Sequence, residues 1–284
     1  MSSISLAPTP LSFARSSLFI AAERAIGHVE NLPLETARNC GIKATYTGPL
    51  LTQQHSMLWQ ALIRHHRDHA SSPDDPVRIR QADLLRAIGR TDTSTDSCRQ
   101  LWKKLKQMQS ALLELRTSKH TFSGQLLGTV TRVEAGPQKG MIIIHLNTML
   151  SSLLSDEIAL IDLDRKLSLG RHQVAAWLHD YISTQSNTRM VPVPVDELRK
   201  LSGSRRPLPQ FRWDLREAIE LLKKGEDPLL TDAHINPKMD ALVYSKNPTK
   251  VVWIGAHVQR LHDTRETMQI ASARVIAGRG EVAL

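Results

Sequence analysis

The chain has 284 residues, a formal net charge of +9 and 41% hydrophobic residues, enough to fill the cores of two compact domains. It has no run of about 20 apolar residues and no charged N-terminal segment followed by an apolar one, so we expect neither a membrane span nor a secretory signal. Cys40 and Cys98 match no metal or redox spacing. We therefore expect a cytoplasmic protein with free thiols.

Residues 1–36 are expected to form a flexible N-terminal segment with a short helix. Residues 1–11 contain Ser, Thr and two Pro residues, a composition typical of disorder. Phe13 to Ile26 has apolar residues at helical spacing and predicts an amphipathic helix. This helix is expected to cover the first domain or to meet another protein.

The first domain is expected over residues 37–150, in the order strand, helix, extended run, two helices and hairpin. These elements are Ile42 to Gly48, Leu51 to Ala70, Pro76 to Arg80, Gln81 to Ile88, Ser94 to Leu115, and a hairpin of Gln125 to Val133 with Met141 to Leu146. This is the order of a winged-helix domain. Lys139, at the tip of the hairpin, is placed to touch DNA phosphate or a minor groove.

The stretch from Ser94 to Leu115 predicts a helix with one apolar face and one cationic face. Its apolar residues recur at helical spacing, while Arg99, Lys103 and Lys106 fall together on the opposite side. Gln81 to Ile88, a shorter helical pattern, precedes it and ends at Gly89 and a polar turn. A short helix, a turn and a longer basic helix are typical of a helix-turn-helix.

The same pattern recurs 114 residues later without a gap. The offset places Asp83 to Gly89 on Glu197 to Gly203, Leu101 on Leu215 and Leu105 on Ile219. An amphipathic helix with a Trp and a short extended run come before each copy, and strand-like segments follow it. We predict an α+β, helix-rich fold of two tandem winged-helix domains related by internal duplication. The second covers residues 151–254, and residues 255–284 form a C-terminal tail.

In the second domain, residues 151–164 are expected to be a helix or a linker. Arg171 to Thr184 is predicted to be a helix capped by a Ser, and Phe211 to Lys224 the recognition helix. Pro228 to Ala233 and Ala241 to Trp253 supply the second hairpin. Chance similarity between two amphipathic helix pairs is the alternative to duplication.

The basic charge is concentrated in the two predicted recognition regions. Arg99 to Lys119 has six Lys or Arg and one acid, and Arg199 to Lys224 has eight and three, so each region carries a net charge of +5. Cationic side chains gain affinity by releasing counterions from phosphates, so we predict salt-sensitive binding to double-stranded DNA; solvated basic faces without a partner are the alternative. The candidate DNA contacts are Arg99, Gln100, Lys103, Lys104, Lys106, Gln107, Lys139, Ser204, Arg205, Arg206, Gln210, Arg212, Trp213, Arg216 and Lys238.

No catalytic, metal or cofactor site is expected. His65 and His69 stand four residues apart, but no HExxH pattern or further ligand cluster accompanies them. A nicking enzyme would need paired histidines, whereas Ile144 to Asn147 offers one, and no phosphate-binding P-loop motif occurs. We therefore expect a DNA-binding protein that is not an enzyme.

Several segments resemble the TrfA type of plasmid replication initiators, relatives of the tandem winged-helix Rep proteins. The resemblance rests on Ala14 to Phe19, on Lys43 to Gly48 followed by Leu58-Trp59-Gln60, and above all on Leu167 to Leu230, which contains LSLGRHQVAAWLHDYIS, ELRKLSGS and FRWDLREAIELL. It covers residues 13–254, and the recognition region of the first domain departs most from the family pattern.

The resemblance implies binding to direct repeats (iterons) at a plasmid origin, help in opening the origin, and recruitment of the host initiator and replicative helicase. It also implies an equilibrium between monomers and dimers. Two recognition helices on one chain can occupy successive major grooves, about 34 Å apart. The alternative is a winged-helix transcriptional repressor without a replication role, which would bind a palindrome as a dimer.

Overall fold

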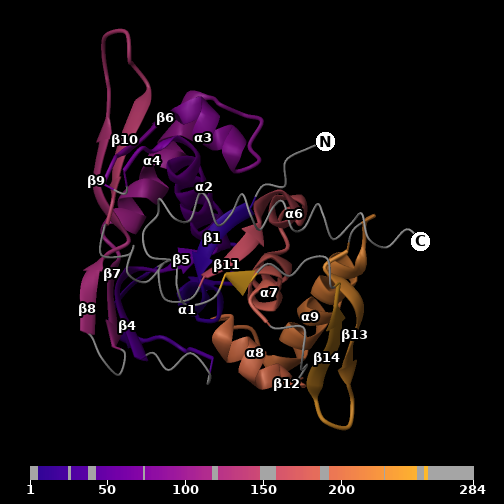
Figure 1. The fold of residues 1–284 in the computed structure, drawn as a ribbon. Coiled ribbons are helices and arrows are strands. Elements are labelled where there is room, and N and C mark those ends of the chain that lie inside the picture. The colour runs from indigo at the N-terminus through magenta and orange to yellow at the C-terminus, as the bar shows by residue number, and fades with distance from the viewer. Residues whose placement is uncertain are drawn as a thin grey trace.

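The computed structural model describes residues 6–24, 27–37, 43–72, 74–116, 121–147, 158–185, 192–226, 228–247 and 253–254. Within these residues the chain is a mixed α+β fold with eight helices (Figure 1). None of the described helices is long and apolar enough to cross a membrane. The expected C-terminal tail, residues 255–284, lies outside the described residues.

One helical unit, within residues 53–146, has three helices and three strands in the expected order. It contains α2 (Gln53–His69), β6 (Val77–Arg80), α3 (Gln81–Ala87), α4 (Thr95–Gln109), β9 (Leu127–Arg132) and β10 (Met141–Leu146). The three strands form an antiparallel sheet in the order β6-β10-β9. The hydroxyl of Ser94 caps α4 by accepting the Ser97 N–H at 3.3 Å. The predicted helix Gln81 to Ile88, the first part of the predicted helix from Ser94, and the hairpin after them are confirmed.

The predicted helix from Ser94 to Leu115 is too long. α4 ends at Gln109, and Leu112–Arg116 forms strand β7, which pairs with β4 (Lys43–Pro49) and β8 (Thr121–Gln125). β3 (His28–Pro33) completes a four-stranded sheet in the order β3-β4-β7-β8. Leu113 and Leu115 are buried whereas Leu112 is 41% exposed, so burial alternates as it does in a strand. Pairing with β4 overrides the helical propensity of this leucine-rich run.

The second helical unit, residues 173–246, repeats the order of the first. It contains α7 (Gln173–Ser183), β12 (Val193–Pro194), α8 (Val195–Leu201), α9 (Leu208–Lys223), β13 (Leu230–Asn236) and β14 (Ala241–Lys246). Its sheet has the order β12-β14-β13, equivalent to β6-β10-β9. Gly89 and Gly203, which the offset of 114 equates, both have positive φ, and Leu101 and Leu215 are both buried.

Two details of the second unit differ from expectation. α9 begins at Leu208 rather than Phe211, because a proline at the first helical turn has no N–H that needs a partner. α7 begins at Gln173, and its N-cap residue His172 makes no side-chain cap bond, so the expected serine cap is wrong. Ser168 instead lies in α6 (Leu163–Ser168).

The N-terminal segment is built into the fold. Residues expected to be disordered form β1 (Leu6–Pro10), which pairs with β11 (Ile158–Asp162); β15 (Trp253–Ile254) pairs with the other edge of β11. The predicted helix from Phe13 to Ile26 is wrong: α1 spans only Leu11–Ala14, and β2 (Phe19–Ile20) pairs in parallel with β5 (Leu51–Thr52). The expected helix or linker over residues 151–164 is likewise replaced, in its described part, by β11 and the start of α6.

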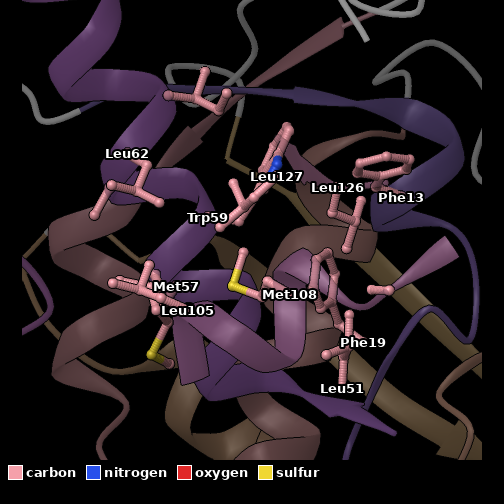
Figure 2. Close-up of a cluster of buried hydrophobic side chains, with 14 of the residues drawn as sticks. Phe13, Phe19, Leu51, Met57, Trp59, Leu62, Leu105, Met108, Leu126 and Leu127 are labelled. Carbon is pink, nitrogen blue, oxygen red and sulfur yellow. The ribbon is translucent and has the colours of Figure 1, made fainter. Parts of the chain in front are cut away.

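Side chains of this segment contact both helical units. Phe13 lies 5.3 Å from Trp59 of α2, ring centroid to centroid, and Figure 2 shows Phe13 and Phe19 in the cluster with Trp59 and Met108. On the other side, Arg15 donates to Thr184 at the end of α7, and the Ala21 N–H donates to the Ser202 carbonyl at 2.8 Å. In Figure 1, β1, α1 and β11 lie between the two units. The segment therefore links them.

A fully buried ion pair lies between the same two units. Lys166 of α6 and Asp180 of α7 are in contact, and the Lys166 ammonium also donates to the Ser56 hydroxyl at 2.8 Å and the Gln60 side-chain carbonyl at 3.2 Å, both on α2. Burial acts to raise the pKa of Asp180, but the neighbouring Lys166 ammonium acts to lower it. The pKa of Asp180 therefore lies below its ordinary value. The network joins α2 to α6 and α7 through charge-assisted hydrogen bonds.

Candidate nucleic-acid interface

The outer face of α4 carries lysines without acidic partners. Lys103 and Lys106 are exposed and Lys104 is half-buried, and within the described part of the chain no carboxylate forms an ion pair with any of the three. Arg99 is exposed and pairs with Asp96 at 3.0 Å, one turn earlier on the helix. The opposite face, with Leu101 and the other buried residues, packs into the core. This amphipathic arrangement presents positive charge to solvent.

The two glutamines of α4 that are predicted DNA contacts, Gln100 and Gln107, differ in exposure and bonding. Gln100 is exposed, whereas Gln107 is half-buried and its side-chain carbonyl accepts from Nε2 of His55 at 3.1 Å. The other ring nitrogen, Nδ1, accepts the Thr52 N–H at 3.0 Å, which satisfies the N-terminus of α2. These two bonds fit a neutral imidazole with the proton on Nε2. His55 therefore orients Gln107.

His55 is expected to make the protein less stable in acid. Burial lowers its pKa from 6.5 to about 4, and the Lys104 ammonium acts in the same direction. Between these values the unfolded chain binds a proton that the folded chain excludes, so the free energy of unfolding falls by about 3 kcal/mol as the pH drops from about 6.5 to about 4. Urea unfolding at pH 7 and pH 5 measures the first part of this loss.

His55→Asn is the variant that tests this assignment, since an Asn carbonyl at this position can still accept the Thr52 N–H. The variant should lose less stability than the wild type between pH 7 and pH 5. His28→Asn, at an exposed position of β3, is the control and should behave like the wild type. Equal pH dependence in His55→Asn and the wild type would show that other groups cause the acid loss.

The β9–β10 hairpin extends the basic surface beyond α4. Lys139 is exposed at its tip, as predicted from the sequence. At the end of β9 that leads into the turn, Trp102 of α4 lies under the guanidinium of Arg132, 5.1 Å from ring centroid to Cζ. This contact attaches the hairpin to the helix, so Lys139 is held at a defined place relative to α4.

In the second unit, two of the four arginines of the predicted interface are paired with acids. Arg212 on α9 donates to both carboxylate oxygens of Asp240, at 2.9 and 2.6 Å, and Arg206 donates to both oxygens of Asp214, at 2.8 and 3.0 Å. The bidentate bond to Arg212 lowers the pKa of Asp240. The α9 arginines therefore present less net charge than the α4 lysines, and the sequence count of +5 for each region overstates the second.

The remaining predicted contacts of the second unit are mostly on the surface. Gln210, Trp213 and Arg216 of α9, Arg205 before it, and Lys238 in the β13–β14 turn are exposed, and Trp213 is 61% exposed. Trp213 is therefore not buried against any other described part of the chain. Ser204 is only 9% exposed, and its hydroxyl accepts the Arg206 N–H at 3.4 Å, so it shapes the turn before α9.

Arg212→Ala is expected to leave the melting temperature close to that of the wild type, because the pair with Asp240 is partly exposed and such pairs stabilise little. We expect the same substitution to weaken DNA binding roughly tenfold. Arg216→Ala, one turn along α9 and without an ion-pair partner in the described residues, is the matched control for stability. Thermal melting and binding to a DNA duplex separate the two effects. A large drop in melting temperature for Arg212→Ala but not for Arg216→Ala would show that the Arg212–Asp240 ion pair stabilises the fold.

Sequence reasoning missed residues whose role depends on neighbours far along the chain. Lys246, the last residue of β14, is 4% exposed and donates to the carbonyls of Ser183 and Gln185 at the end of α7. Burial and, to a smaller extent, Arg15 lower its pKa to about 8. Lys166 was likewise not singled out. No periodicity or motif marks a lysine that bonds to distant carbonyls, so these positions required the structure.

The fold of this chain is similar to that of two solved structures. No protein-family model matches the chain, and no curated protein matches it. A crystal structure of domains 2 and 3 of RctB, as a selenomethionine derivative, is similar with a TM-score of 0.57 and 14% identity, covering 84% of this chain and 98% of that one. A second structure of RctB domains 2–3 gives a TM-score of 0.52 and 14% identity, covering 80% and 97%. At this identity the likeness establishes the arrangement of the elements.

Proposed function

We propose that this protein is a replication initiator that binds direct repeats in double-stranded DNA through two tandem winged-helix domains. The observation that carries the proposal is the repeated unit: a helix, a strand, two helices and a hairpin, with the second helix of each pair exposing polar side chains. Similarity to RctB domains 2 and 3 supports a replication-initiator role in general. The TrfA-like segments point toward a plasmid initiator.

In this proposal α4 and α9 enter successive major grooves of one duplex, about 34 Å apart. Lysines and arginines would bind phosphates or guanine edges, and Gln100, Gln107 or Gln210 would read adenine. Because the two helix faces carry different residues, a single chain would read an asymmetric repeat of roughly 20 base pairs. The chain acts by binding and is not an enzyme; DNA bending and strand capture would open the origin.

The proposed partners are the origin repeats, the host initiator and the replicative helicase, and the chain would exist in an equilibrium between monomers and dimers. Footprinting of the purified protein on the DNA that flanks its own gene, at two salt concentrations, tests the proposal. We expect regularly spaced protection over direct repeats that weakens at the higher salt concentration. A single protected palindrome would favour a winged-helix repressor, and no protection at either salt would contradict DNA binding.

The lysines of α4 give a quantitative prediction. Lys103→Ala combined with Lys106→Ala should reduce the slope of log affinity against log salt by about two, because each phosphate contact releases about 0.9 counterion. Both side chains are exposed, so folding should be unaffected. Fluorescence anisotropy with a labelled repeat at several salt concentrations measures the slope. An unchanged slope would show that Lys103 and Lys106 of α4 do not contact DNA phosphates.

A further inference from the structure

A surface groove lies between the two helical units and is lined by cations from three separate parts of the chain. Arg90 comes from the turn between α3 and α4, Lys104 from α4, Arg171 from the turn before α7, and Arg24 from the segment after β2. Glu23 is the only carboxylate in its described lining. We call this the central groove.

The cations of the central groove form no ion pairs within the described residues. Arg24, Arg90 and Arg171 are exposed, and in the ranges that the structure describes none of them forms an ion pair. Burial lowers the pKa of Lys104, and the charges of Arg90 and Lys103 lower it further. Mutual repulsion of this kind is relieved by an anion placed among the groups. The groove is therefore complementary to negative charge.

A second groove continues the basic surface toward α9. It is lined by Gly203, Arg205 and Arg206 from the turn that precedes α9, and it shares Arg24 and Glu23 with the central groove. The two grooves together extend from the face of α4, at Gln100 and Lys104, to the start of α9. A continuous polyanion can follow this path, whereas a small anion would occupy only part of it.

We propose that the central groove binds the sugar–phosphate backbone of duplex DNA at the middle of the bound site, between the two major-groove segments contacted by α4 and α9. This inference rests on the proposed function. Arg90 and Arg171 would each contact a phosphate, and Arg24 would contact the backbone between them and the second groove. Because phosphates carry no sequence information, these contacts set the position of the duplex and add affinity for any sequence.

The lining distinguishes a duplex from a single strand. Proteins that hold single-stranded DNA combine positive charge with aromatic side chains on which the bases stack. Neither groove has an aromatic residue in its described lining. The bases must therefore remain stacked within the duplex, with only their backbone facing the groove.

The test is the variant Arg90→Gln/Arg171→Gln, compared with Lys43→Gln/Arg116→Gln. The control removes the same charge from paired positions of β4 and β7, outside both grooves. Binding is measured by fluorescence anisotropy with a duplex repeat, a duplex of scrambled sequence and a single strand. The groove variant should lower the salt slope by about two and weaken binding to both duplexes by the same factor, while the control should match the wild type.

Uncharged methylphosphonates in the DNA show which phosphates contact the central groove. Replacing two charged phosphates at the centre of the repeat should weaken binding of the wild type but change little in the groove variant, since the interaction is already lost. An unchanged duplex slope in the groove variant, or a loss confined to the single strand, would overturn the proposal. Failure of the wild type to bind any duplex would instead overturn the proposed function, so the two failures are distinguishable.

Discussion

Replacing Lys166 by Met is expected to lower the free energy of unfolding by about 3–5 kcal/mol, because it leaves a buried carboxylate without its counter-charge. Lys166 is 0% exposed and Asp180 is 3% exposed, so water cannot solvate the carboxylate that remains. Ser56 and Gln60 of α2 would also lose their ammonium partner. Urea unfolding at pH 7, followed by circular dichroism, measures the loss.

Two further variants show whether the charge itself is responsible. Lys166→Met/Asp180→Leu removes both charges and should recover much of the lost stability, since a buried ion pair can often be replaced by apolar residues of similar volume. Arg64→Met breaks a partly exposed ion pair with Asp164, whose atoms lie 3.8 Å apart, and should cost only about 0–1 kcal/mol. A double variant no more stable than Lys166→Met would contradict the buried ion pair.

Gly203→Ala is expected to destabilise the protein by about 3 kcal/mol. Gly203 has φ +62°, a conformation that costs an alanine about 1–2 kcal/mol. A Cβ there would also lie 2.6 Å from Cγ2 and 3.1 Å from Cβ of Ile20, and such overpacking costs about 1–3 kcal/mol. Thermal or urea unfolding of the variant measures the sum.

Gly170→Ala is the matched control for this prediction. Its φ is +61°, but a Cβ at Gly170 would meet nothing within 4 Å, so only the conformational cost applies. Gly203→Ala should therefore be clearly less stable than Gly170→Ala. Equal losses would mean that Ile20 does not pack against the turn between α8 and α9, and that the N-terminal segment is not part of the second unit's surface.

The helices of both units were predictable because their stability comes from one apolar face at helical spacing. Leu101, Leu105 and Met108 are all buried, and the ungapped offset of 114 correctly placed their counterparts in α9. Leu112–Arg116 was not predictable, since its leucines suit a helix as well as a strand. Only pairing with β4, far earlier in the chain, decides between them.

The N-terminal segment shows the same limit. Leu18 and Phe19 suggested one face of a helix, but their burial comes from packing between two units and from pairing of β2 with β5. Local periodicity cannot indicate that a segment is buried from both sides.

The exposure of several candidate side chains was predictable from the sequence, but their effective charge was not. Exposure of Lys103, Lys106, Arg205 and Arg216 follows from the helical and turn patterns. The ion pairs of Arg206 and Arg212 depend on carboxylates brought close by the turn and the β13–β14 hairpin, so a count of charges along the sequence misses them. The central groove was missed because its cations come from separate segments.

Hydroxyl-radical footprinting on a single isolated repeat tests most directly whether one chain places two helices on the same DNA. If α4 and α9 enter successive major grooves, we expect two protected patches on one face of the duplex, centred about one helical turn apart. Lys103→Ala/Lys106→Ala should weaken one patch, and Arg216→Ala the other. One patch alone, or two symmetrical patches that weaken together in each variant, would contradict a single chain with two reading helices.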